Sequence, residues 1–108
     1  MPKAIMFVQT NPAHPDREDE YNAWYSDVHI PEVCAIDGIK GATRYQLSDA
    51  TPLGPDAHRY AAVYELEADD LKGVLGELVE RATDGRMHMS DVLAMDPPPS
   101  MVIYELLD

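Results

Sequence analysis

The order of strand and helix patterns along the chain constrains its fold more than any other feature. Apolar residues repeat at every second position in four segments, as in strands, and at every third or fourth position in two segments, as in helices. The strands are expected at residues 4–10, 39–48, 57–67 and 101–106, and the helices at residues 16–30 and 69–83. A chain of 108 residues suits one domain spanning residues 1–108,. The order β-α-β-β-α-β predicts an α+β fold, in which an antiparallel four-stranded sheet carries both helices on one face.

The strand patterns also indicate that the second face of the sheet is covered. The first, third and last strands carry apolar side chains on both faces. Helices on one face of this ferredoxin-like arrangement leave the other face open. A second copy of the chain would cover it, so we expect a homodimer with two sheets packed face to face around a shared interior. In the second strand, the odd positions form the more apolar set, which consists of Ile39, Thr43, Tyr45 and Leu47.

The first helical segment contains a distinctive stretch at residues 21–32, which reads Y-N-A-W-Y-S-D-V-H-I-P-E. Its large apolar residues recur at i, i+3, i+4 and i+7 and therefore form one stripe on a helix. Pro31 lacks an N–H, and its ring would clash with the carbonyl of Asp27, so the helix is expected to end or kink there. His29 would then lie where the helix stops, beside a cavity.

Two other segments are expected to be irregular. Residues 49–56 read D-A-T-P-L-G-P-D and predict a long hairpin loop before the third strand,. Residues 86–96 predict either a loop or a short helix lying over a cavity. The second helix is expected to begin after Asp69 or Asp70 as its N-cap.

The charge balance excludes several classes of partner. Eight basic and twenty acidic residues give a formal net charge of −12, which repels nucleic acid and anionic membranes. No apolar segment approaches the ~20 residues that a membrane-spanning helix needs. The single cysteine, Cys34, rules out an intrachain disulfide, and no secretory signal is expected at the N-terminus,. These features favour a cytoplasmic protein that acts on small molecules.

Motifs for common cofactors and nucleophiles are not found in the sequence. There is no glycine-rich phosphate loop, and the histidines lack carboxylate or thiolate partners at metal-ligand spacing,. Ser26 and Asp27 do not place a Ser-His-Asp triad around His29, because residues two apart do not share a helix face. We therefore expect no metal and no cofactor.

Histidine and tyrosine are the candidate catalytic residues. His29 can donate and accept protons near neutral pH, although it could instead cap carbonyls freed by Pro31. Tyr25, one turn earlier, could orient His29 or bind the substrate, and His88 could be a second acid or base if it reaches the cavity. The candidate substrate-binding residues are hydroxyl donors on adjacent strands and one methionine of a possible lid: Tyr45, Tyr60, Tyr64 and Met87,.

The motif W-Y-x-x-V-H-I-P-E at residues 24–32, followed by I-D-G-I-K-G-A-T-R-Y at residues 36–45, resembles the EthD-type branch of the dimeric α/β-barrel superfamily. The resemblance covers about the first half of the chain. It implies the ferredoxin-like fold paired into a dimeric barrel. In several cofactor-free members, a histidine of the first helix acts as an acid or base inside the barrel, and the resemblance transfers this role to His29 alone.

Three functions follow as expectations. The first is a cofactor-independent enzyme that uses His29 on a small hydrophobic carbonyl or phenolic compound, aromatic or polyketide-like. The reaction would be of the cyclase, lyase, isomerase or monooxygenase type. The second is a binding or carrier protein for an apolar intermediate. The third is a haem-dependent enzyme with His29 as the haem ligand.

Overall fold

The computed structural model describes residues 3–50, 58–96 and 98–107. Within them, four strands and a set of helical segments follow the predicted order. The strands are β1 (Lys3–Thr10), β2 (Ile39–Gln46), β3 (Tyr60–Glu67) and β4 (Ser100–Glu105). The helical segments are η1 (Pro15–Arg17), α1 (Glu18–Trp24), η2 (Tyr25–His29), α2 (Ile30–Cys34) and α3 (Leu71–Thr83).

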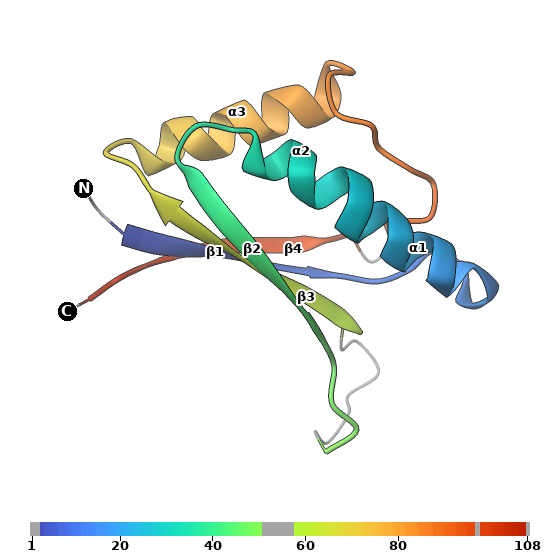
Figure 1. Cartoon of the computed structure of the whole chain (residues 1–108). Helices are drawn as coiled ribbons and strands as arrows, with labels where there is room; N and C mark the ends of the chain where they lie inside the picture. Colours follow the sequence, from blue (N-terminus) through green and yellow to red (C-terminus); the bar gives the residue numbers. More distant parts are fainter. Residues whose placement is uncertain (1–2, 51–57, 97, 108) are drawn as a thin grey trace.

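The four strands form one antiparallel sheet in the order β2-β3-β1-β4. Figure 1 shows α1, α2 and α3 together on one side of this sheet, with the chain termini near one another at one end of β1 and β4. The predicted α+β, ferredoxin-like arrangement is therefore confirmed. None of the helices in the described ranges is long and apolar enough to cross a membrane.

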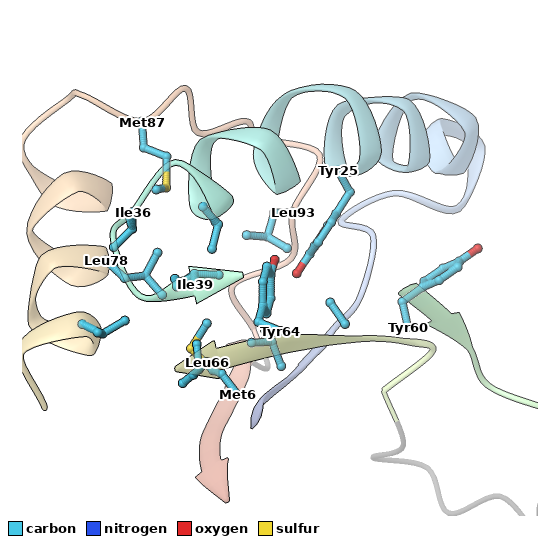
Figure 2. Close-up of a cluster of buried hydrophobic side chains, with 14 of the residues drawn as sticks. Met6, Tyr25, Ile36, Ile39, Tyr60, Tyr64, Leu66, Leu78, Met87 and Leu93 are labelled. Atoms are coloured by element: carbon cyan, nitrogen blue, oxygen red, sulfur yellow. The ribbon is translucent and has the colours of Figure 1, made fainter. Parts of the chain in front are cut away.

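The two faces of the sheet differ in burial, as the two-residue period predicts. On the helix-covered face, β1 and β3 contribute buried side chains in matching register, and α1, α2 and α3 pack on them. The buried strand residues are Ala4, Met6, Val8, Thr10, Tyr60, Ala62, Tyr64 and Leu66. Figure 2 shows several of them meeting Ile36, Leu78, Met87 and Leu93 in the core between the two layers.

The face assignment predicted for β2 is wrong beyond its first residue. A register irregularity between Ile39 and Gly41 shifts the alternation by one position, as an extra residue in a bulge does. Ile39 is buried, but Thr43 and Tyr45 lie on the opposite face, across from Val63 and Ala61 of β3. The even-numbered residues after the bulge consequently face the helices.

The sequence analysis expected the helix to end or kink at Pro31, and the structure shows that it does not end there. It continues from α1 through five residues of π-helix, η2, into α2, which contains Pro31 at its first turn. The Ile30 N–H donates to the Tyr25 carbonyl, five residues back. The wider π turn lets a proline follow, because the first turn of an α-helix tolerates a residue without an N–H.

The second predicted helix agrees closely with α3. Asp70 is its N-cap, and its Oδ1 accepts a hydrogen bond from the Gly73 N–H at 3.0 Å. A Cβ at Gly73 would lie 2.5 Å from an oxygen of the Asp70 carboxylate, so a larger residue there would require the Asp70 side chain to shift. Gly85 follows the helix with a φ of 91°, a conformation that glycine adopts without strain,.

Residues 86–96 form an irregular segment that runs beside α1 toward β4 (Figure 1). It is tied down by backbone hydrogen bonds from Ala13 N to Val92 O at 2.7 Å and from Ala94 N to Asn11 O at 2.9 Å. Val92 and Leu93 are buried. Of the expected hairpin loop, residues 51–56 lie outside the described residues, as does the expected first residue of the third strand.

Candidate functional site

Aromatic side chains from two layers meet between the first helix and β3. The centroids of the Tyr21 and Tyr25 rings are 5.7 Å apart, and those of Tyr21 and Tyr60 are 5.1 Å apart. Figure 2 shows the hydroxyl ends of Tyr25 and Tyr64 directed toward each other from the helix and the strand. We call this group, Tyr21, Tyr25, Tyr60 and Tyr64, the tyrosine cluster.

His29 adjoins the tyrosine cluster at the end of the π-helical segment. Its ring stacks on Trp24, with centroids 4.8 Å apart and an interplanar angle of 21°. The ring also meets Tyr25 edge to face, with centroids 5.0 Å apart. Nδ1 of His29 is buried and has no hydrogen-bond partner in the described part of the chain. It does not cap a helix carbonyl, which was the structural alternative for this residue.

Burial decides the charge of His29. Loss of solvent lowers its pKa from 6.5 to about 4, and the nearby Glu32 carboxylate opposes the shift only partly. Because the helix continues into α2, His29 does not face a helix C-terminus that would favour the charged form,. The imidazole is therefore neutral at neutral pH. No partner fixes its tautomer, so it can accept or donate a proton toward a bound molecule.

The hydroxyl groups of the tyrosine cluster are protonated donors. Burial raises the pKa of Tyr64, Tyr25 and Tyr60 and raises that of Tyr21 to about 12. The Tyr21 hydroxyl bonds to Thr10. The Tyr60 hydroxyl donates to Glu18 at 2.6 Å. The Tyr64 hydroxyl is buried and directed toward the Tyr25 hydroxyl (Figure 2), and it forms no hydrogen bond of normal geometry with the described residues.

Tyr45 does not join this group. It lies on the open face of the sheet, opposite to the tyrosine cluster, with 55% of its surface exposed. The expected meeting of Tyr45 with Tyr60 and Tyr64 is therefore wrong, and the cause is the bulge near Gly41. Tyr60 and Tyr64 do share one buried face of β3, as predicted.

His88 points away from the protein interior. Its side chain is 81% exposed and its Nδ1 lies 2.6 Å from Glu32 Oε2. The His88 backbone N–H also donates to Glu32, and the His88 carbonyl accepts from Trp24 Nε1 at 2.9 Å. His88 thus fixes residues 86–96 to the helix, and the condition for its role as a second acid or base, that it reaches a cavity, is not met in this structure. Met87 beside it is 5% exposed and belongs to the core (Figure 2).

The structure adds one residue that sequence reasoning did not select. Arg44 projects from β2 toward the helices, and its guanidinium carbon lies 4.6 Å from the Tyr25 ring centroid. The corresponding distances to Tyr60 and Tyr21 are 5.4 and 5.6 Å. Arg44 has an even number and so falls outside the more apolar set of its strand, and only recognition of the bulge would have placed it on the helix side.

Several surface grooves lie away from His29, and two of them are next to charged residues. One of about 530 Å³ runs between the turn before β2 and the start of α3, with Lys40, Glu67 and Asp70 in its lining. Another of about 150 Å³ lies between Glu32 and Arg86 and includes Met87. Among the described residues, no group of three or more His, Cys, Asp or Glu side chains is placed to hold a metal ion.

Comparison with known proteins supports the fold. No protein family and no curated protein matched the sequence. Among solved structures, an EthD-like protein from Ralstonia eutropha JMP134 is 16% identical, with 97% of this chain and 93% of that chain covered and a TM-score of 0.57. An ethyl tert-butyl ether d (EthD) family protein from Bacillus halodurans C-125 is 11% identical. The match covers 99% of this chain and 100% of that chain, and the TM-score is 0.53.

A third similar structure is a dimeric ferredoxin-like protein of unknown function from Thermobifida fusca YX. It is 14% identical, with 97% of this chain and 92% of that chain covered and a TM-score of 0.53. At these identities the likeness concerns the backbone arrangement and not the chemistry. The chain therefore has the EthD-like form of the ferredoxin-like fold, as the motif at residues 24–45 suggested.

Proposed function

We propose that the protein is an acid–base enzyme that acts through its own side chains on a small, hydrophobic carbonyl or phenolic compound. The observation that carries this proposal is a pair of buried polar groups without partners, His29 Nδ1 and the Tyr64 hydroxyl. They flank Tyr25 in an aromatic environment. Buried polar groups are otherwise almost always paired, because an unmade hydrogen bond costs free energy. A substrate oxygen and an acidic C–H or O–H group would satisfy both.

In the proposed reaction, the neutral imidazole of His29 removes a proton from a carbon next to the substrate carbonyl. The electron pair of that C–H bond moves onto the carbonyl oxygen and forms an enolate. A tyrosine hydroxyl donates a hydrogen bond to the enolate oxygen, and Tyr64 is free to do so,. Return of the proton to another atom gives isomerisation, while attack of the enolate carbon on an electrophile gives cyclisation. Elimination follows from the same enolate when a substituent on the β-carbon departs with its bonding electron pair, and oxygenation requires dioxygen as a second substrate that reacts with the enolate carbon.

Trp24 controls access in this proposal. Its ring covers His29, and its Nε1 donates to the carbonyl of His88 on the segment that crosses the helix. A ligand reaches the imidazole when Trp24 and residues 86–89 move together. Residues 86–89, which Glu32 and Trp24 hold through His88, would thus act as the lid that the sequence analysis placed at Met87.

The test uses 2-tetralone, a bicyclic ketone with acidic α-protons, in D₂O. Proton NMR measures how fast each variant exchanges these protons for deuterium. We expect the full-length protein to accelerate exchange, and His29→Phe to reduce the acceleration by about 10²- to 10⁴-fold, the usual contribution of a general base. His14→Phe, at an exposed histidine, is the control and should exchange like the original protein. Equal exchange rates in the original protein and His29→Phe would refute the proposal.

The same assay separates the two alternatives. A carrier protein would bind 2-tetralone without accelerating exchange, and His29→Phe would change its affinity alone. A haem enzyme would take up added haem with a Soret absorption band that His29→Phe removes.

We also propose that the protein forms a homodimer through the open face of its sheet. Apolar side chains on this face are exposed along three strands, namely Ile5, Tyr45, Val102 and Tyr104. Exposed apolar side chains gathered on one face of a sheet are typical of an interface. Sedimentation equilibrium should give twice the chain mass, and Val102→Glu should give the monomer mass. A monomeric original protein at micromolar concentration would contradict this.

A further inference from the structure

Arg44 lies in an unusual electrostatic position for this chain. Each of the other four arginines forms an ion pair with a carboxylate. The shortest nitrogen–oxygen distance in each pair lies between 2.6 and 2.9 Å, and the residues are Arg17, Arg59, Arg81 and Arg86. Arg44 forms none within the described part of the chain, although acidic residues outnumber basic ones by twenty to eight. Its charge is therefore left without a counterion beside the tyrosine cluster.

The hydrogen bonds of Arg44 occupy only part of its guanidinium. Nη1 donates to Ser26 Oγ at 3.0 Å and to the Asn22 carbonyl at 3.4 Å, and Nη2 donates to Asn22 Oδ1 at 3.0 Å. All three acceptors are neutral. Asn22 thus engages the end of the guanidinium between Nη1 and Nη2. The adjoining edge, formed by Nε–H and the second Nη2–H, donates to no carboxylate among the described residues, and the Tyr21 hydroxyl is the neutral group that lies close to the guanidinium.

That edge has the geometry of a fork for an anion. The two parallel N–H groups of an arginine edge match the two oxygens of a carboxylate. The rings of Tyr25, Tyr60 and Tyr21 surround the guanidinium and are themselves buried, so the planar body of a ligand would pack against them once this cluster opens,. Arg44 is half-buried, so its charge is partly shielded from water, and a bound anion would interact with it strongly.

We propose that Arg44 is a specificity-determining residue that binds a carboxylate on a planar, aromatic ligand. This inference deepens the proposed function, on which it rests for the entry of the ligand beside the tyrosine cluster. The negatively charged surface would repel such a ligand at long range. A single unpaired arginine next to the site provides the short-range attraction that selects it.

The experiment compares two probes of the same shape, 2-naphthoate and its neutral amide, 2-naphthamide, by isothermal titration calorimetry on the full chain. We expect the original protein to bind naphthoate at least about tenfold more tightly than naphthamide, because a charged fork is stronger than a neutral contact. In Arg44→Met this preference should disappear. The matched control is Arg59→Met, since Arg59 also lies over the Tyr60 ring, at 6.0 Å, but pairs with Glu18 at 2.9 Å. The Arg59→Met variant should still bind naphthoate more tightly than naphthamide.

A second measurement does not depend on the stability of Arg44→Met. In ¹⁵N-labelled protein, the Nε–H resonance of Arg44, assigned by its absence in Arg44→Lys, should shift on addition of naphthoate and stay in place with naphthamide. The inference is overturned if naphthoate shows no saturable binding, if Arg44→Met retains the preference, or if the Nε–H resonance does not move. Failure of the proposed function is a different result: His29→Phe would leave tetralone exchange unchanged while the naphthoate preference persisted.

Discussion

The buried imidazole of His29 predicts a specific dependence of stability on pH. Its pKa in the folded protein is about 4, below the ordinary value of 6.5 that applies in the unfolded chain. As the pH falls from 6.5 toward 4, His29 binds a proton in the unfolded state but stays neutral in the folded state. The free energy of unfolding must therefore decrease as the pH falls from 6.5 toward 4 and become independent of this group below 4,.

The size of the effect follows from the same two values. A shift of one pKa unit corresponds to about 1.4 kcal/mol, so the difference between 6.5 and about 4 corresponds to roughly 3 kcal/mol when the window is fully crossed,. Between about pH 7.5 and about pH 5, most of the unfolded chains become protonated at this position and the folded ones do not. The expected loss over that interval is about 2 kcal/mol.

The variant that isolates this contribution is His29→Phe, because phenylalanine is similar in shape and can stack on Trp24 without titrating. Urea denaturation of both proteins at half-unit steps of pH gives the free energy of unfolding. The difference between the two curves should change by about 2 kcal/mol across the interval. It should persist in about 1 M salt, since salt screens charge pairs but not the cost of burying a charge. Parallel curves for the two proteins would show that His29 is not buried as described.

Three further changes test other parts of the structure. Asp70→Ala removes the acceptor for the Gly73 N–H and should lower the free energy of unfolding by about 1 kcal/mol in urea denaturation,; an unchanged midpoint would contradict the cap. Glu32→Gln weakens the contact that holds His88, so trypsin should cleave near this segment several-fold faster under native conditions, and an unaltered cleavage rate would argue against that role. Tyr64→Phe removes a buried hydroxyl without a partner, so it should leave stability unchanged or raise it by up to about 1 kcal/mol,. The same variant should slow tetralone exchange, and a loss of stability would mean that the hydroxyl is hydrogen-bonded in the native protein.

The sequence predicted the layers of this fold because periodicity is a local property. The alternation in residues 57–67 placed Tyr60 and Tyr64 on one face, and the spacing in residues 69–83 predicted a helix with Asp69 or Asp70 as its cap, of which Asp70 is the one observed. Each of these assignments depends on the side chains of one segment alone. Packing against the rest of the protein then agreed with the local pattern.

The errors have a common physical origin, a change of one residue in the backbone repeat. A bulge near Gly41 moved Tyr45 out of the site and Arg44 into it. A π-helical turn before Pro31 let the helix continue, and so kept His29 within a helix and not at its end. Neither irregularity changes the residues that a periodicity search counts. Both change which side chains face the core, because a shift by one position reverses a strand face.

Both irregularities lead to the same place in the molecule, and this convergence is the strongest argument that a site exists there. The π turn presents His29 with a buried Nδ1 that has no partner, and the bulge presents Arg44 with no counterion among the described residues. The Tyr64 hydroxyl, also without a partner, lies across Tyr25 from them. Among the described residues, His29 Nδ1 and the Tyr64 hydroxyl are the buried side-chain nitrogen and oxygen atoms that form no hydrogen bond of normal geometry. Departures from the rules of pairing and burial are tolerated where function requires them, so three departures around one tyrosine cluster indicate a binding site.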